Sequence, residues 1–151
     1  MVIGLNSEQH EMGSIKLSLD RSLLDLPYAY RYLHDHMYWA KSLTFDAFQR
    51  AVTNSAVVVG AYDSAKNEQL VGFSRVVSDL ATFAYLTDVF IVEQYRCRGL
   101  SRKMLEMIIH HPDLQGLRRF LLVTEDAHGL YAKFGFEPLH DGANWMQIYN
   151  G

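Results

Sequence analysis

One stretch decides the fold of this chain: AYLTDVFIVEQYRCRGLSRKMLEMIIHH, residues 84–111. It opens with apolar, β-branched and aromatic residues that predict a strand over Leu86–Val92. A turn over residues 93–99 ends at Gly99, and a helix is predicted from Leu100 to His111. The first amides of such a helix lack intrahelical acceptors and lie at the positive end of the helix dipole. The sequence therefore predicts an anion site at this turn, with phosphate as its natural ligand.

The flanking segments predict a mixed α/β domain around that stretch. Alternation and β-branched runs predict further strands over 14–20, 56–62, 69–77, 119–123 and 145–149. Helices are predicted over 23–34, 45–53 and 126–134, with Thr44 as an N-cap and Gly135 as a left-handed C-cap. Residues 1–13 show no periodicity, so we expect a disordered leader followed by a single domain over 14–151.

Bulk composition is that of an ordinary globular protein. The chain has 151 residues, of which 49% are hydrophobic and 21% charged, enough for one folded domain. Its apolar runs are far shorter than the roughly 18 residues of a membrane helix. Polar residues occupy 6–9, where a signal peptide would be apolar, and the single Cys97 has no disulfide partner. We therefore expect a cytoplasmic protein that does not contact a membrane.

Charge is distributed unevenly along the chain. Residues 96–119 carry a net charge of +4 and the remainder carries −7, which gives −3 overall. A local basic patch in an acidic protein suits a small polyanion and disfavours nucleic acid, which requires an extended positive face. For Arg102 and Lys103 in the patch, ordinary surface solubility is the better explanation.

Two motifs in this order and separation resemble those of the GNAT superfamily of N-acetyltransferases. Arg96-x-x-Gly99-x-Ser101 is similar to its pyrophosphate-binding signature, with Ser101 where the family has Gly or Ala. The second signature is matched by Ala127-x-x-x-Tyr131-x-Lys133-x-Gly135-Phe136. The resemblance implies the GNAT fold, with a mixed central sheet of six to seven strands, four helices and a splay between the fourth and fifth strands.

The resemblance also implies acetyl-CoA as co-substrate, with its pantetheine arm in the splay. Backbone amides of Val89–Val92 would pair with the arm as an added strand. The expected cofactor-binding residues are Val89, Phe90, Ile91, Val92, Arg96, Cys97, Arg98, Gly99, Leu100, Ser101 and Thr124. Thr124 stands where the family commonly has Asn. Cys97 is interpreted as a chance thiol, because no base for a cysteine nucleophile is identified.

Two residues are candidates for proton transfer. Tyr131 matches the general acid of the family, which protonates the leaving thiolate. A phenol with a pKa of about 10 can supply that proton without being ionised at rest. The alternative is that Tyr131 only packs the short helix. Asp88 is the candidate general base for the attacking amine, whereas Glu93 is more typical of a solvated loop carboxylate.

The acceptor region is expected in the aromatic stretch Tyr28–Trp39, which runs from the first predicted helix into the loop after it. In the family, the first two helices and their connection form one wall of the acceptor pocket, which selects Tyr38 and Trp39 as substrate-binding residues. The alternative is a homodimer interface. The spacing of His34, His36 and the His110–His111 pair predicts no metal site.

The predicted function is direct transfer of an acetyl group from acetyl-CoA to an amine of a small molecule or peptide, with no covalent enzyme intermediate and no metal. The alternative is a non-catalytic module of the same fold that binds acyl-CoA as a sensor or partner subunit.

Overall fold

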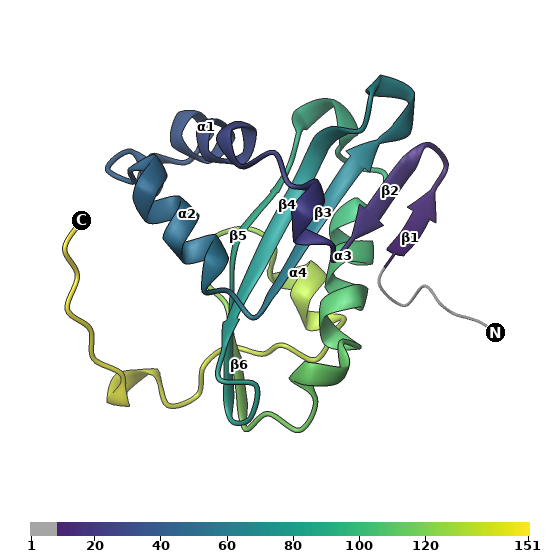
Figure 1. The fold of residues 1–151 in the computed structure, drawn as a ribbon. Coiled ribbons are helices and arrows are strands. Elements are labelled where there is room, and N and C mark those ends of the chain that lie inside the picture. Colours follow the sequence, from purple (N-terminus) through teal and green to yellow (C-terminus); the bar gives the residue numbers. More distant parts are fainter. Residues whose placement is uncertain (1–8) are drawn as a thin grey trace.

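The computed structural model describes residues 9–151 and is built on one six-stranded sheet (Figure 1). The strands lie in chain order: β1 (Gln9–Met12), β2 (Ile15–Ser18), β3 (Val57–Asp63), β4 (Gln69–Ser78), β5 (Phe83–Ile91) and β6 (Arg119–Leu121). Neighbours from β1 to β5 pair antiparallel, and β5 pairs with β6 in parallel. The parallel pair requires a crossover, which the helix between β5 and β6 supplies.

Four α-helices cover the sheet in the described part of the chain. They are α1 (Leu26–His36), α2 (Phe45–Thr53), α3 (Leu100–Ile109) and α4 (His128–Ala132). The carboxylate of Asp25 caps α1 at the amide of Tyr28, and the hydroxyl of Thr44 caps α2 at the amide of Ala47. Figure 1 shows α1 and α2 on one face of the sheet and α3 on the other.

The core lies between these layers. Its fully buried members include Leu17, Leu33, Phe48, Val59, Val71, Phe73, Val76, Met104 and Ile108. β3 is buried along all seven residues, which explains the continuous apolar run of its sequence. None of the helices in residues 9–151 is long and apolar enough to cross a bilayer.

Most predicted elements are confirmed, including the mixed α/β sheet, the cap at Thr44 and the left-handed Gly135 with φ +95°. The prediction of a disordered leader is wrong for residues 9–12, which form β1 because their backbone pairs with β2. The rest of that leader, residues 1–8, lies outside the described residues.

The predicted strand over 145–149 is also wrong. These residues have no strand partner, and Met146 and Ile148 are 95% and 92% exposed. A strand needs a neighbouring edge to satisfy its backbone groups, and this segment extends away from the sheet instead (Figure 1).

The splay expected between the fourth and fifth predicted strands is present between β5 and β6. Only residues 83–85 of β5 pair with β6, through Arg119, Phe120 and Leu121. β5 continues to Ile91 without that partner, while β6 ends at Leu121. The two strands therefore separate toward their C-terminal ends and leave an opening between them.

Candidate active site

The turn between β5 and α3 presents free backbone amides. Gly99 has the left-handed conformation (φ +82°) and begins α3 with no side-chain cap. The first helical hydrogen bond runs from the amide of Lys103 to the carbonyl of Gly99, at 3.0 Å. The amides of Leu100, Ser101 and Arg102 precede it and therefore have no acceptor within the helix. They form the helix terminus that the sequence predicted as an anion site.

Gly99 meets a conformational requirement at this turn. A side chain at φ +82° would be strained, although a Cβ at Gly99 would meet only Met12 Cε, at 3.6 Å. The space around the turn is thus open enough for a ligand to approach the backbone. Cys97 also has a positive φ, +63°, and its thiol is exposed.

The turn is fastened to the sheet by a buried tyrosine. The hydroxyl of Tyr95 donates a 2.6 Å hydrogen bond to Oδ2 of Asp63, at the end of β3. Asp63 also accepts from the hydroxyl of Ser14 and the amide of Ala65. The hydrogen bond from Tyr95 is the main cause that lowers the pKa of Asp63, and the same bond raises the pKa of Tyr95.

Arg96, one of the residues expected to bind the cofactor, makes two hydrogen bonds within the chain. Its Nε donates to the carbonyl of Ile91 at 2.9 Å. A second nitrogen of the guanidinium donates to the hydroxyl of Tyr32 at 3.2 Å. Arg96 therefore ties the turn to β5 and α1. Arg98 lies above the Tyr95 ring at 5.0 Å, and both arginines are exposed at the surface of the turn.

The free edge of β5 offers fewer amides than expected. The amide of Val92 donates to the carbonyl of Val71 in β4, at 2.8 Å, so it faces away from the opening. Because backbone groups alternate along a strand, Phe90 also faces β4, whereas Val89 and Ile91 face the opening. Two of the four residues predicted to pair with the pantetheine arm are therefore placed to do so.

The second predicted motif lies beyond β6, on α4. The ring of Tyr131 makes an edge contact with Phe136 at 5.9 Å, and Phe136 contacts Phe120 of β6 at 5.4 Å. Burial raises the pKa of the Tyr131 phenol, and the charge of Asp126 adds to the effect. The phenol therefore keeps its proton at neutral pH.

Thr124 uses its hydroxyl within the chain. Its Oγ1 accepts a 3.0 Å hydrogen bond from the amide of Ala127, the residue that precedes α4. This bond ties the segment after β6 to the residue before α4, and a contact of Thr124 with acetyl-CoA stays a prediction.

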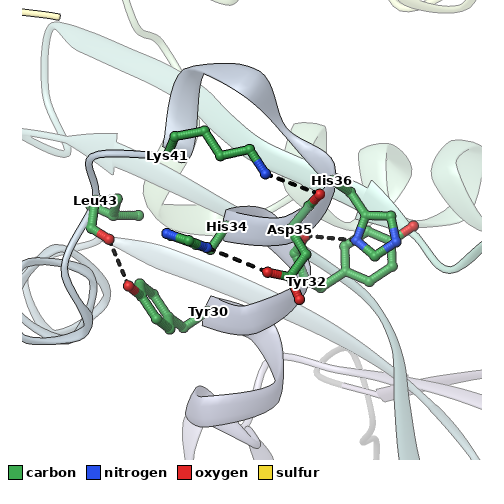
Figure 2. A network of polar contacts seen from close by, with 7 residues as sticks. All are labelled: Tyr30, Tyr32, His34, Asp35, His36, Lys41 and Leu43. Carbon is green, nitrogen blue, oxygen red and sulfur yellow. Dashed lines mark hydrogen bonds and ion pairs between the residues drawn. The ribbon is translucent and has the colours of Figure 1, made fainter.

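The predicted acceptor residues lie on a fixed connection between α1 and α2. The hydroxyl of Tyr30 donates to the carbonyl of Leu43 at 2.7 Å, and Lys41 Nζ donates to the carbonyl of Asp35 at 3.2 Å (Figure 2). His36 contacts the carbonyl of Tyr32 through Nδ1 at 3.0 Å. These bonds hold both ends of the connection, so its position is set before any ligand binds.

A stack of rings joins α1 to the sheet under this connection. His36 stacks on Tyr32 with ring centroids 4.0 Å apart, and Tyr32 stacks on Phe90 of β5 at 4.3 Å. Figure 2 shows the rings of His36 and Tyr32 overlapping. Since Tyr32 also accepts from Arg96, the stack connects the acceptor side of the site to the turn.

Tyr38 and Trp39 occupy different surroundings on the connection. Tyr38 is 74% exposed, and its hydroxyl lies 3.4 Å from Oε1 of Glu125, in the segment after β6. Trp39 lines a cavity of about 290 Å³ together with Thr44, Arg75 and Asp88. Tyr38 thus reaches across the opening, and Trp39 forms a wall of the neighbouring cavity.

Asp88 lies in that cavity wall as one half of a buried ion pair. Its Oδ2 is 2.6 Å from Nε of Arg75, and only 6% of Asp88 is exposed. The residue has φ +57°, next to a register shift between β4 and β5. Protonation of Asp88 would leave the buried guanidinium without its partner. This geometry opposes the general-base role that the sequence suggested.

Sequence reasoning missed four residues that shape the site: Tyr32, Asp63, Arg75 and Glu125. Their partners lie 64, 32, 13 and 87 positions away in the chain. No local pattern predicts such pairs. Within residues 9–151, no three His, Cys, Asp or Glu side chains gather in a way that could hold a metal ion.

Comparison with known proteins agrees with this geometry. The family model described as the acetyltransferase (GNAT) family matches residues 21–136. A Gibberella zeae protein named as an acetyltransferase is 31% identical over 140 residues, which cover 80% of this chain and 77% of the relative. The match spans most of the chain, so this protein belongs to the GNAT family of acetyltransferases.

Solved structures show the same fold. A crystal structure from Xanthomonas campestris, described as a member of the same family, has a TM-score of 0.85 and 43% identity, covering 93% of this chain and 96% of that one. An acetyltransferase from Clostridium acetobutylicum, crystallised with acetyl-CoA, has a TM-score of 0.60 and 18% identity, covering 89% and 94%. At that identity the second likeness concerns the fold alone.

Proposed function

We propose that this protein transfers an acetyl group from acetyl-CoA directly to an amine. The observation that carries the proposal is the uncapped N-terminus of α3, which follows the strand bordering the opening between β5 and β6. Membership of the acetyltransferase family supports it. The crystallisation of a relative of the same fold with acetyl-CoA supports the choice of co-substrate.

The chain offers suitable partners for each part of that molecule. The amides of Leu100, Ser101 and Arg102 would bind the pyrophosphate, with Arg98 adding positive charge nearby. The backbone of Val89 and the amide of Ile91 would pair with the pantetheine arm along the free edge of β5, whereas the carbonyl of Ile91 already accepts from Arg96. These contacts are made by backbone groups, so the departure at Ser101 from the family signature leaves them intact.

Tyr131 is proposed as the general acid. When bound, acetyl-CoA supplies the thioester carbonyl that the amine attacks. As the new C–N bond forms and the C–S bond breaks, the phenol of Tyr131 gives its proton to the departing sulfur. The raised pKa of Tyr131 keeps that proton available at neutral pH. The proton lost by the amine then restores the phenol, directly or through water, which balances the reaction.

The acceptor is proposed to enter beside the connection between α1 and α2. Trp39 supplies an apolar wall of the 290 Å³ cavity, and the exposed ring of Tyr38 lies next to Glu125. An ammonium group on a small molecule or a peptide would be attracted to that carboxylate and to the faces of the rings. Asp88 is proposed to orient Arg75 and the strand around it, and no proton transfer is assigned to it.

The test compares Tyr131→Phe with the matched variant Tyr149→Phe, whose hydroxyl lies in the exposed tail. Tyr131→Phe should lower kcat about 100-fold, because the thiolate then leaves without its acid. Its affinity for acetyl-CoA should stay close to that of the unchanged protein. Thiol release with a panel of amines and isothermal titration with acetyl-CoA measure the two quantities.

An unchanged kcat for Tyr131→Phe, in a reaction whose rate is limited by the chemical step, would show that Tyr131 only packs the short helix. Acetyl-CoA binding without turnover of any amine in the panel would instead support the non-catalytic acyl-CoA module.

A further inference from the structure

β6 ends the sheet with an edge whose sequence is typical of an interior strand. The sheet order stops at β6, which pairs only with β5. Residues 120–123 read Phe-Leu-Leu-Val, a continuous apolar run of the kind found in strands that are covered on both faces. All four remain at least partly exposed, and Val123 is 82% exposed. Natural edge strands are usually protected by charged residues, by proline or by a covering segment. Residues 120–123 contain neither a charged residue nor a proline.

The C-terminal tail, defined as Trp145–Tyr149, is an exposed segment with the composition of a strand. Its side chains include two aromatic rings and two long apolar chains, and their exposed fractions are 42% for Trp145, 95% for Met146, 92% for Ile148 and 72% for Tyr149. Apolar side chains gathered in this way are uncommon on the surface of a monomer. Figure 1 shows the tail running clear of the sheet.

A polar clamp directs the tail away from its own β6. Both terminal nitrogens of Arg119 bind the carboxylate of Asp141, at 3.3 and 3.2 Å. The indole of Trp145 donates to the same carboxylate at 3.3 Å, and the Arg119 guanidinium lies 4.7 Å from the Trp145 ring centroid. A 3₁₀ turn over Gly142–Asn144 completes the clamp. The tail is thus anchored at the first residue of β6 and leaves the domain from there.

The clamp also borders an open cavity beside β6. The cavity has a volume of about 430 Å³ and is lined by Phe120 and Leu121 of β6 and by the segment from Phe134 to Asp141. A chain that filled this space would cover the exposed side of β6. Trp145 of the chain's own tail is bound to Asp141 at the rim, and the apolar residues after it are exposed.

We propose that two copies of this protein exchange their C-terminal tails, so that Trp145–Tyr149 of each copy adds as a strand to the free edge of β6 in the other. The two segments match in length, since residues 119–123 and 145–149 each span roughly 17 Å as extended chain. The two segments are also chemically complementary, because the exposed apolar side chains of each would be buried against those of the other. The exchange is reciprocal, as a two-fold dimer requires, and it leaves no apolar edge unpaired.

The exchange has a consequence for the site. β6 borders the opening, and through Phe120 and Phe136 it supports the helix that carries Tyr131. A strand from the second copy would complete the sheet on that side, so each site would rest on residues of both copies.

Single charges placed on either half of the contact test the proposal in the full chain. Analytical ultracentrifugation of the unchanged protein should give about twice the chain mass of 17.3 kDa. Ile148→Asp in the tail and Val123→Asp, two residues after the end of β6, should each give the mass of one chain. Both side chains are exposed within a single copy, so neither change should affect folding. The matched control is Leu80→Asp, a charge on an exposed apolar residue of the β4–β5 turn, which should remain dimeric.

Cysteine cross-linking separates exchange from other arrangements. In a Cys97→Ser background, which removes the only native thiol, single cysteines are scanned over 121–123 and over 146–148. Mixing a β6 variant with a tail variant should give a disulfide-linked pair of chains, which neither variant gives alone. A monomeric unchanged protein, a dimer that survives both charge variants, or a cross-link within one chain of the double variant would each overturn the proposal.

Discussion

The hydroxyl of Tyr95 donates a 2.6 Å hydrogen bond to Oδ2 of Asp63, and this bond fastens the turn between β5 and α3 to the end of β3. Both residues are buried, with 9% of Tyr95 and 5% of Asp63 exposed. The turn itself contains two residues with positive φ, Cys97 and Gly99. A backbone of that kind keeps its shape only when its surroundings hold it, and the Tyr95–Asp63 bond is such a restraint.

Removing that hydroxyl should weaken the binding of acetyl-CoA. Tyr95→Phe keeps the ring but releases the turn from β3, so the amides at the start of α3 lose part of their preorganisation. Tyr30→Phe is the matched control, because it also removes one tyrosine hydrogen bond, to Leu43, away from the turn. Isothermal titration should show a higher Kd for acetyl-CoA in Tyr95→Phe only. Equal affinity in both variants would show that the turn holds its shape without Asp63.

The same bond should make stability depend on acidity. The pKa of Asp63 is lowered in the folded protein, chiefly by the hydrogen bond from Tyr95, whereas an unfolded aspartate has a pKa of about 3.9. Its contribution is therefore present above that value and is lost as the pH falls through the folded pKa. The Tm difference between the unchanged protein and Asp63→Asn should be largest near neutral pH and shrink below about pH 4. A constant difference from pH 7 to pH 3 would contradict the assignment.

Alanine substitutions at Gly99 and Gly116 can distinguish a loss of stability caused by backbone strain from a loss of acetyl-CoA binding. Both have positive φ, +82° and +71°, and both have room for a methyl group. Alanine at either position should lower the free energy of unfolding by about 1 kcal/mol, because its Cβ disfavours the left-handed conformation. Only Gly99→Ala should also weaken acetyl-CoA binding, by about tenfold or 1.4 kcal/mol. Equal Kd values for the two variants would place the anion site elsewhere.

The connection between α1 and α2 should control the choice of amine. Tyr38→Ala with Trp39→Ala removes an aromatic wall and the contact with Glu125, so KM for the amine should rise about tenfold, the loss of about 1.4 kcal/mol of binding. KM for acetyl-CoA and the sedimentation coefficient should stay unchanged. The control is Leu80→Ala, an exposed apolar residue far along the chain in the β4–β5 turn. A changed sedimentation coefficient with an unchanged amine KM would assign the pair to assembly.

Local sequence predicted most of the framework. The cap at Thr44, the left-handed Gly135 and the strand–turn–helix around Gly99 all depend on residues within a few positions of one another. Such features follow from backbone stereochemistry and from hydrogen bonds between near neighbours. The two motifs, Arg96–Ser101 and Ala127–Phe136, indicated the family. The resemblance to that family in turn predicted the splay between β5 and β6.

The roles of individual charged groups could not be obtained in that way. Arg96 was expected to face a pyrophosphate, and Asp88 was expected to accept a proton. In the structure Arg96 binds Ile91 and Tyr32, and Asp88 is paired with Arg75. A charged side chain is stabilised by whichever partner the fold brings within hydrogen-bonding distance, and these partners come from other strands and helices.

The sequence by itself determined most of the strands and helices and the free amides at the start of α3, because those properties are set by local periodicity, glycine conformation and helix termini. Only the tertiary structure decided where residues 145–149 go. Their alternation fits a strand, but a strand exists only beside an edge that accepts its hydrogen bonds. The clamp of Arg119, Asp141 and Trp145 joins residues 22 and 26 positions apart in the chain, and it turns this segment away from the sheet that its sequence suits.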